Sequence, residues 1–209
     1  AAAFDYFGAS PDFPRVLLMP GSRKQEILNL LPDMLAAAEK ITQQVPGCQF
    51  FLPVASTISR EMLRTLLDKY NVHVTLTNDQ TYDLMNICDV AVAASGTATL
   101  ETSLLKVPTV IIYRVAMLTY LIGKQLVKIP DIGLPNIVAG RRIVPELLQD
   151  DVNPEAIAAE TVRLLIDGEA RRQVLADLEE VHTKLGETGA VNRVAEVILE
   201  VAGENRRVE

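Results

Sequence analysis

Short, continuously apolar segments alternate with segments of helical periodicity between residues 15 and 113. The first apolar run, residues 15–20 (RVLLMP), lies between two prolines, which is typical of a strand buried on both faces. Residues 27–45 then carry apolar side chains at helical spacing until Pro46 and Gly47 end the pattern. Because strands that alternate with helices form parallel sheets, the pattern predicts an α/β, Rossmann-like sheet with helices on both faces.

The same criteria place the remaining elements. Further strands are expected at 49–54, 72–76, 89–93 and 108–113, and further helices at 59–70, 82–87 and 98–105. From residue 151 the pattern predicts helices only, at 154–166, 170–185 and 191–202. The sequence therefore predicts a Rossmann-like domain over 15–150 and a C-terminal helical segment over 151–209.

Composition excludes several classes of protein. With 49% hydrophobic residues the chain is not intrinsically disordered. The two cysteines, Cys48 and Cys88, lie forty residues apart, which excludes a CxxC metal site. They are interpreted as small, buried hydrophobic residues of a protein in a reducing compartment. The two histidines, His73 and His182, are interpreted as structural or surface residues, so no metal site is expected. The net charge of −7 argues against nucleic acid as a partner.

The charge is unevenly distributed. Residues 151–209 contain 13 acidic and 7 basic side chains, whereas residues 1–150 contain 14 and 13. Residues 102–145 contain six basic side chains against Asp131 alone. Within this stretch, residues 115–129 are strongly apolar but shorter than the ~20 residues that cross a bilayer. They are either a helix of the core or an apolar, basic-flanked face for an anionic membrane or a lipid chain.

Two loops follow predicted strands, where open parallel sheets bind their ligands. In the first, Gly21 permits a tight turn, Ser22 offers a hydroxyl, and Arg23 can clamp a phosphate with two N–H groups. An ordinary strand–helix turn with an exposed arginine explains the same residues.

The second loop covers residues 94–101 (ASGTATLE) and opens a predicted helix. Small residues allow backbone N–H groups to approach a diphosphate at the positive end of the helix, and Ser95 and Thr97 add hydroxyl donors. Glu101, one turn later, could accept hydrogen bonds from both hydroxyls of a ribose. The alternative is a capped helix in which Glu101 only favours the dipole. The loop matches neither the P-loop nor GxGxxG, so no nicotinamide cofactor is expected.

A third cluster, residues 133–140 (GLPNIVAG), is interpreted as a sharp bend that presents Asn136, with a structural turn as the alternative. No arrangement of Ser, His and Asp, or of Cys and His, suggests a catalytic nucleophile.

Four ordered motifs carry a family resemblance: residues 18–23 (LMPGSR), residues 95–101 (SGTATLE), Tyr113-Arg114 and residues 134–140 (LPNIVAG). In sequence and spacing they resemble the lipid-A-disaccharide synthase family over about residues 4–200. The family consists of GT-B glycosyltransferases with two Rossmann-like halves. They transfer 2,3-diacylglucosamine from its UDP derivative to 2,3-diacylglucosamine 1-phosphate, releasing UDP, at the cytoplasmic face of the inner membrane.

The resemblance implies that this chain is the C-terminal, nucleotide-sugar-binding half, with residues 1–14 as a linker from an N-terminal domain. Ser22 and Arg23 would then face the phosphates of the donor. The diphosphate would be held by Ser95, Gly96 and Thr97, and the ribose by Glu101. The sugar side of the cleft would be bordered by Tyr113, Arg114 and Asn136.

The resemblance also implies a metal-independent, cofactor-free transfer, in agreement with the absence of an Asp-x-Asp pair from the sequence. A general base is expected in the other half, so this chain alone should bind UDP without turnover. The implied partners are the UDP-sugar donor, the lipid acceptor and an anionic membrane surface, with a homodimer also open. The alternatives are another GT-B enzyme acting on UDP-sugars, such as an epimerase or a peptidoglycan-type transferase, and a noncatalytic module that uses its acidic helices.

Without a preceding half, the apolar residues of the last helices are expected to be exposed. They are Ile157, Leu164, Leu165, Val174, Leu178, Val181 and Leu185.

Overall fold

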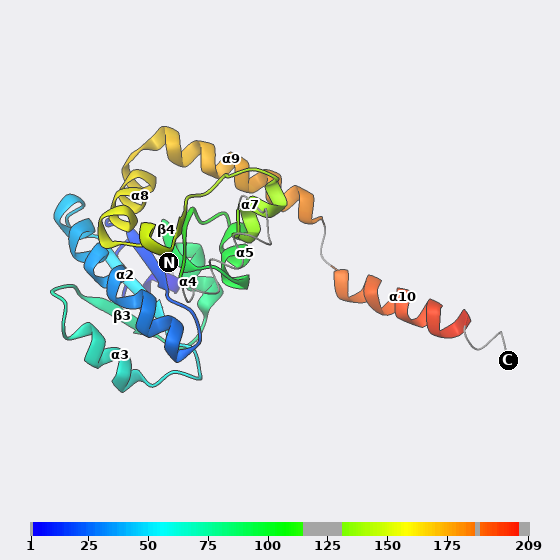
Figure 1. Ribbon diagram of the computed structural model, residues 1–209, viewed down its shortest axis with the longest axis horizontal. Coiled ribbons are helices and arrows are strands. Elements are labelled where there is room, and N and C mark those ends of the chain that lie inside the picture. The colour runs from blue at the N-terminus through cyan, green and yellow to red at the C-terminus, as the bar shows by residue number, and fades with distance from the viewer. Residues whose placement is uncertain (1, 115–130, 187–188, 205–209) are drawn as a thin grey trace.

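The computed structural model describes residues 2–114, 131–186 and 189–204 of the 209-residue chain. The apolar segment 115–129 therefore lies outside the described residues. Within them, six parallel strands form one sheet in the order β3-β2-β1-β4-β5-β6 (Figure 1). The strands are β1 (Arg15–Met19), β2 (Gln49–Pro53), β3 (Val74–Thr77), β4 (Val90–Ala94), β5 (Thr109–Tyr113) and β6 (Glu146–Leu148). The predicted α/β, Rossmann-like sheet is confirmed.

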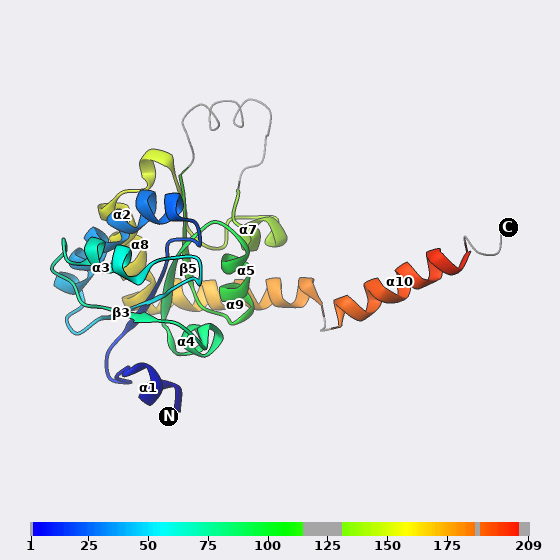
Figure 2. The same ribbon diagram turned by 90° about the horizontal axis from the view of Figure 1, so that it is seen from below.

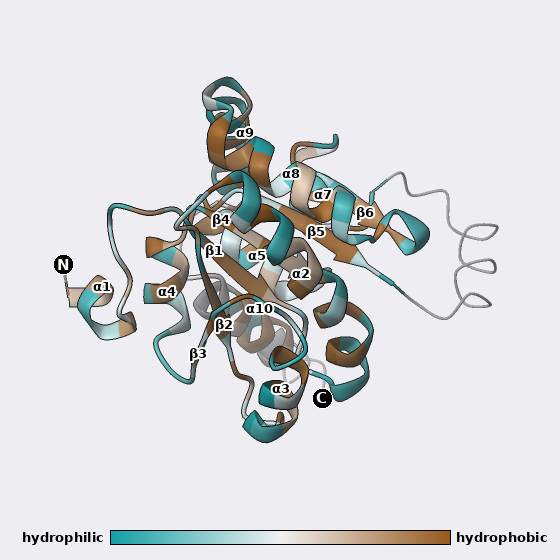
Figure 3. Ribbon diagram, turned by 90° about the vertical axis from the view of Figure 1, so that its left-hand side faces the viewer, coloured by the Kyte–Doolittle hydropathy of each residue, from teal (hydrophilic) through white to brown (hydrophobic). Residues whose placement is uncertain are grey.

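Both faces of the sheet are covered, which explains why its strands are continuously apolar. Val16 and Leu18 of β1 belong to one buried cluster, together with residues of α2 (Lys24–Gln44) and α8 (Pro154–Ile166). Leu17, between them in sequence, belongs to a second cluster with residues of α4 (Thr81–Ile87). Successive side chains of a strand point to opposite faces, so each face needs its own apolar set. Figure 3 shows the strands as the hydrophobic centre of the molecule.

Two further helices follow strands within this arrangement. The helix α3 (Arg60–Leu67) follows β2, and α5 (Thr97–Leu104) follows β4. The N-terminus of α3 is capped by Ser59, whose hydroxyl accepts a hydrogen bond from the Met62 N–H. The helix α2 begins at Lys24, three residues before the predicted start. The carboxylate of Glu26 accepts from the Arg23 N–H and closes the first turn.

Three elements were not predicted from the sequence. The helix α1 (Ala2–Phe7) packs near α4 and buries Phe7. The helix α7 (Leu134–Ala139) has Pro135 in its first turn and ends at Gly140, which adopts a left-handed conformation. The sharp bend expected over residues 133–140 was therefore wrong. The third element, β6, is followed directly by the 3-10 helix η1 (Gln149–Asp151).

The expectation that the last helices expose their apolar residues was also wrong for most of them. Ile157 and Leu164 of α8 are fully buried, because α8 packs on α2 and on the sheet. The next helix, α9 (Gly168–Leu185), buries its apolar side against α5 and α7. Its buried residues include Val174, Leu178 and Val181, whereas Leu185 is exposed. These helices are part of the fold of the sheet domain.

The last helix, α10 (Ala190–Glu204), differs from α8 and α9. It extends away from the sheet in both ribbon views (Figures 1 and 2). Its apolar side chains at 194, 197, 198, 199 and 201 are exposed. No helix in the described part of the chain has the length and apolar character that crossing a membrane requires.

Candidate functional site

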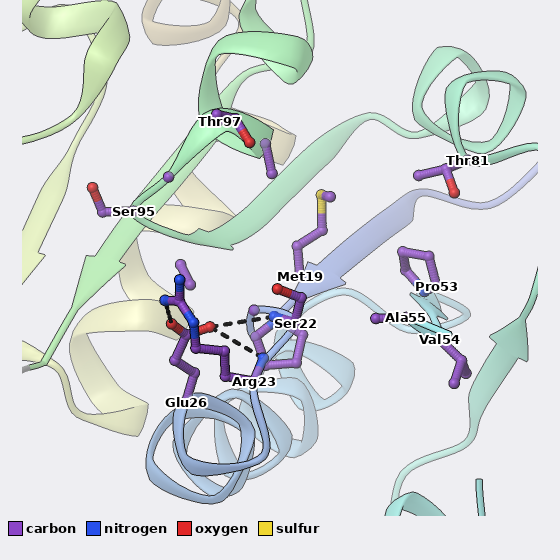
Figure 4. Close-up of a pocket in the computed structure, with 15 residues that line it drawn as sticks. Met19, Ser22, Arg23, Glu26, Pro53, Val54, Ala55, Thr81, Ser95 and Thr97 are labelled. Carbon is purple, nitrogen blue, oxygen red and sulfur yellow. Dashed lines mark hydrogen bonds and ion pairs between the residues drawn. The ribbon is translucent and has the colours of Figure 1, made fainter. Parts of the chain in front are cut away.

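A cavity of about 470 Å³ opens at the carboxyl ends of β1 and β4 (Figure 4). It lies where the strand order reverses, since β1 pairs with β2 on one side and with β4 on the other. Open α/β sheets bind ligands at this switch point. The described residues that line the cavity are Met19–Arg23, Glu26, Pro53–Ala55, Thr81 and Ala94–Ala98.

The first wall of the cavity is the connection from β1 to α2. Gly21 has a φ of +107°, and a Cβ at this position would lie 2.4 Å from the Glu26 Oε2 atom. That oxygen accepts hydrogen bonds from the Ser22 and Arg23 amides, both at 3.3 Å. The other oxygen, Oε1, pairs with the Arg23 guanidinium at 2.6 Å. The predicted pair Ser22 and Arg23 therefore lines the cavity together with a carboxylate that the sequence did not indicate.

The second wall is the connection from β4 to α5, where Ser95, Gly96 and Thr97, the residues expected to hold a diphosphate, line the cavity. Ser95 and Thr97 are labelled in Figure 4. Gly96 is the N-cap of α5, and no side chain caps this end of the helix. A Cβ at Gly96 would meet no atom within 4 Å. The first-turn amides of a helix have no intrahelical acceptors, so this end of α5 can receive an anion. The Ser95 hydroxyl donates to the Ile132 carbonyl at 3.4 Å.

A third wall was not predicted from the sequence. It consists of the end of β2, from Pro53 to Ala55, and the start of α4 at Thr81. The Thr57 hydroxyl donates to the Ser22 carbonyl at 2.8 Å and so links the loop after β2 to the first wall. The rule that ligands meet the carboxyl ends of neighbouring strands points to this loop, because β2 is the immediate neighbour of β1.

The chemistry available at the cavity is that of hydrogen-bond donors. Arg23 and Glu26 are the charged side chains among its described lining residues. In the part of the chain that the structure describes, no group of three or more His, Cys, Asp or Glu residues could hold a metal ion. Cys48 and Cys88 precede β2 and β4 at the opposite, amino ends of the strands. Burial raises the pKa of the Cys48 thiol to about 12 and also raises that of Cys88, as expected of inert thiols.

Four of the predicted site residues do not line the cavity. Glu101 lies on α5 one turn beyond Thr97 and is partly exposed. Tyr113 ends β5 and is exposed. Both lie at or beyond the strand ends at the cavity edge of the sheet, because they follow β4 and β5 in the chain.

The side chain of Arg114 is fixed by hydrogen bonds to other elements of the fold. Its guanidinium pairs with Asp33 of α2 at 2.8 Å and donates to the carbonyls of Asn29 and Val152. These bonds direct the side chain toward α2 and the segment before α8. The structure therefore places this cation as a link between elements.

Asn136 is almost fully buried within α7, with 1% of its surface exposed. Its side-chain oxygen accepts from the amides of Ile143 and Val144, and its NH₂ group donates to the Val144 carbonyl and to Glu146. The side chain is therefore not presented at a bend, contrary to the prediction, because its hydrogen bonds close the loop between α7 and β6.

Comparisons with known proteins identify relatives of this chain. Residues 5–201 match the family model described as lipid-A-disaccharide synthetase. The lipid-A-disaccharide synthase of Geobacter sulfurreducens is 45% identical over 197 residues, which cover 94% of this chain and 51% of that protein. The chain thus spans about half the length of the curated relatives that it matches.

Solved structures support the fold at much lower identity. Sucrose-phosphate synthase from Thermosynechococcus elongatus aligns with a TM-score of 0.63 at 14% identity, covering 97% of this chain and 49% of that one. The calicheamicin glycosyltransferase CalG4 aligns with a TM-score of 0.60 at 16% identity, covering 93% and 45%. In each case the chain corresponds to about half of the larger protein.

Proposed function

Because this chain belongs to the lipid-A-disaccharide synthase family, we propose that it binds the nucleotide-sugar donor of that family's reaction. The reaction is the transfer of 2,3-diacylglucosamine from its UDP derivative to 2,3-diacylglucosamine 1-phosphate, with release of UDP. The family match favours this function over the epimerase, the peptidoglycan-type transferase and the noncatalytic module.

One observation carries the proposal. The cavity lies at the switch point of the sheet, and the N-terminus of α5 opens into it without a side-chain cap. A helix N-terminus without a side-chain cap at the edge of a cavity suits a diphosphate. Its volume of about 470 Å³ falls within the range of ~300–1,000 Å³ usual for small-molecule sites.

The proposed roles follow the motifs. Ser95, Gly96 and Thr97 hold the diphosphate at α5, and Ser22 and Arg23 approach it from α2. Glu101 receives the ribose hydroxyls. Tyr113, Arg114 and Asn136 belong to the sugar side of the cleft. The hydrogen bonds of Arg114 and Asn136 are made to other parts of the chain, so these two residues position the elements around the sugar and do not bind it directly.

In the proposed transfer, an acceptor hydroxyl forms a bond to the anomeric carbon while the bond from that carbon to the UDP oxygen breaks. The electron pair leaves with the diphosphate, so donors fixed around its oxygens lower the barrier. The hydroxyl also needs a general base. Among the described cavity-lining residues, the one carboxylate is that of Glu26. It borders the proposed diphosphate position, which is the leaving-group side, whereas the base for an inverting attack acts on the opposite face of the sugar. We place the base in the half of the family enzymes that this chain does not span.

The direct test is titration of this chain with UDP by calorimetry. Wild-type protein is expected to bind UDP, and Glu101→Ala is expected to weaken UDP binding more than uracil binding. Glu61→Ala is the matched control, because Glu61 is also a helical glutamate but lies outside the cavity lining. Absence of UDP binding at millimolar concentration would contradict the proposed function.

The proposed partners also include a lipid acceptor, the anionic, cytoplasmic face of the inner membrane and a second copy of the chain. The membrane proposal depends on the basic stretch that contains Lys124 and Lys128. Co-sedimentation with anionic liposomes should decrease with salt and with charge reversal of these two lysines. Binding that neither change affects would exclude this stretch as the membrane contact.

A further inference from the structure

The cavity described above is lined by a carboxylate of the chain itself, that of Glu26. Its described lining residues carry one positive side chain, Arg23, and one negative side chain, Glu26, and these two form an ion pair. A diphosphate would bring at least two negative charges to the same place. The inference below rests on the proposed function, because it concerns how that ligand enters the cavity.

The carboxylate of Glu26 occupies the positions that a phosphate would take at the start of α2. One oxygen accepts from two consecutive backbone amides, those of Ser22 and Arg23, and the other binds the Arg23 guanidinium. Gly21 makes room for this arrangement, since any Cβ there would clash with the carboxylate. Backbone amides and an arginine are also the groups that bind phosphate oxygens in proteins.

The two helix ends at the cavity therefore differ. At α5 no side chain caps the helix, and the space beside Gly96 is open. At α2 the amides and the guanidinium are already engaged by Glu26. The Arg23 side chain is 81% exposed, whereas that of Glu26 is 34% exposed, so the arginine is free to turn toward the cavity once the pair opens.

We propose that Glu26 is a gating residue that competes with the donor's diphosphate for Arg23 and the α2 amides. In the empty cavity the carboxylate holds these donors. When the diphosphate binds at α5, the ion pair opens and Arg23 turns to the phosphate oxygens. When UDP leaves, the carboxylate takes the donors back, which weakens the retention of the product. Glu26 thus sets the affinity for the charged part of the nucleotide and leaves the uridine part unaffected.

The competing explanation is that Glu26 serves only as the cap of α2. A glutamate at the third helical position commonly accepts from the amide of the N-cap residue. The two roles predict different dependences on Arg23. If the carboxylate only caps α2, removing its charge changes UDP affinity by the same factor with and without Arg23. If it competes for Arg23, removing its charge strengthens UDP binding more when Arg23 is present.

The test compares Glu26→Gln with wild type in titrations of UDP and of uridine. Glutamine keeps an oxygen that can accept from the Arg23 amide, so the helix cap is retained, but it removes the charge. We expect UDP to bind about 1.5- to fivefold more tightly to the variant, the range that corresponds to one exposed ion pair. Uridine affinity should not change. Glu61→Gln, which removes a charge from the first turn of α3, is the control and should leave both affinities unchanged.

A second comparison tests whether the effect of Glu26 depends on Arg23. In an Arg23→Gln background, Glu26→Gln should have a smaller effect on UDP affinity, because the guanidinium for which the carboxylate competes is missing. An unchanged ratio of UDP to uridine affinity, or weaker UDP binding to Glu26→Gln, would overturn the gating role while leaving the proposed function intact. If neither wild type nor Glu26→Gln binds UDP, both proposals are overturned.

Discussion

At the scale of single residues, Asn136 and Glu146 organise the segment that returns the chain to the sheet edge. Glu146 is 7% exposed, and its carboxylate accepts from the amides of Ile132 and Gly133 and from the Asn136 NH₂ group. A buried carboxylate is costly unless donors surround it, and these three supply that compensation. The Ile132 carbonyl also accepts a hydrogen bond from the Ser95 hydroxyl, which connects this network to the second wall of the cavity.

Substitution Asn136→Ala should reduce the free energy of unfolding by about 2–4 kcal/mol, because it removes the acceptor of two buried amides and the donor to the Val144 carbonyl and to Glu146. Urea denaturation measures this loss. Asn86→Ala, the same change at an exposed position of α4, is the control and should cost little. A loss of UDP affinity at unchanged stability would instead assign Asn136 to the ligand.

The partly buried thiol of Cys48 and the buried thiol of Cys88 should make the free energy of unfolding depend on pH in the alkaline range. Burial, reinforced by Asp89, raises the pKa of Cys48 to about 12, and it also raises that of Cys88, whereas the ordinary value is 9.0. A raised pKa in the folded state means that the stabilisation is complete below pH 9 and is lost as the pH rises above it. Between pH 8 and pH 10 the free energy of unfolding should fall by about 1 kcal/mol for each of the two thiols. Urea unfolding at both pH values should show a smaller loss in the double variant Cys48→Ala, Cys88→Ala, and an equal loss would contradict the prediction.

At the scale of elements, two strand–helix connections with a glycine form the cavity, yet the two glycines have different roles. Gly21 needs its positive φ and the space taken by Glu26. Gly96 has an extended φ of 167° and open space beside it. The fold therefore requires the first glycine, whereas neither the backbone conformation nor the surroundings of the second require one.

Substitution Gly21→Ala should lower stability by about 1–3 kcal/mol, because alanine is strained at this φ and its Cβ clashes with Glu26. Gly96→Ala should lower stability by about 0.5–1 kcal/mol, because alanine is a poorer N-cap residue than glycine. It should nevertheless weaken UDP binding, since its methyl group enters the space of the diphosphate. Thermal unfolding and UDP titration of both variants separate the two effects. Unchanged UDP affinity in Gly96→Ala would exclude α5 as the diphosphate site.

The elements that the sequence predicted well are those with long, uniform patterns. The continuous apolar runs placed β1, β2, β4 and β5 within a residue of their observed bounds, because burial on both faces leaves no room for polar side chains. The elements missed are short. The strand β6 has three residues and includes the buried Glu146, and α7 has six, too few to show a period.

At the scale of the whole molecule, the helices α8 and α9 complete the core although their composition is acidic. The side chain of Arg171 in α9 donates to the Asp89 carbonyl at the start of β4, 82 positions earlier in the chain. The excess of acidic residues lies on the outer surface of these helices, where Glu179 and Glu180 pair with Lys106, Lys184 and Arg141. Net charge thus says little about which helices are part of the core.

A pair of substitutions in α8 tests this packing. Leu164→Ala should reduce the free energy of unfolding by about 2–5 kcal/mol, because Leu164 is fully buried and its truncation leaves a cavity. Ile166→Ala, two residues later, should change stability by less than about 0.5 kcal/mol, because Ile166 is 68% exposed. Equal effects in chemical denaturation would mean that α8 does not pack on the sheet as described.

The sequence by itself determined the alternation of strands and helices between residues 15 and 113, and with it the parallel sheet and the edge at which the cavity forms. Apolar periodicity carries that information because it is local to each element. Only the tertiary structure decided which polar side chains remain available at that edge. Arg114 finds Asp33 81 positions away and Val152 38 positions away, and Asn136 closes a loop onto Glu146. Such partners meet only after the chain folds, so motif spacing identified the connections that form the site but not the bonds that already engage Arg114, Asn136 and Arg23.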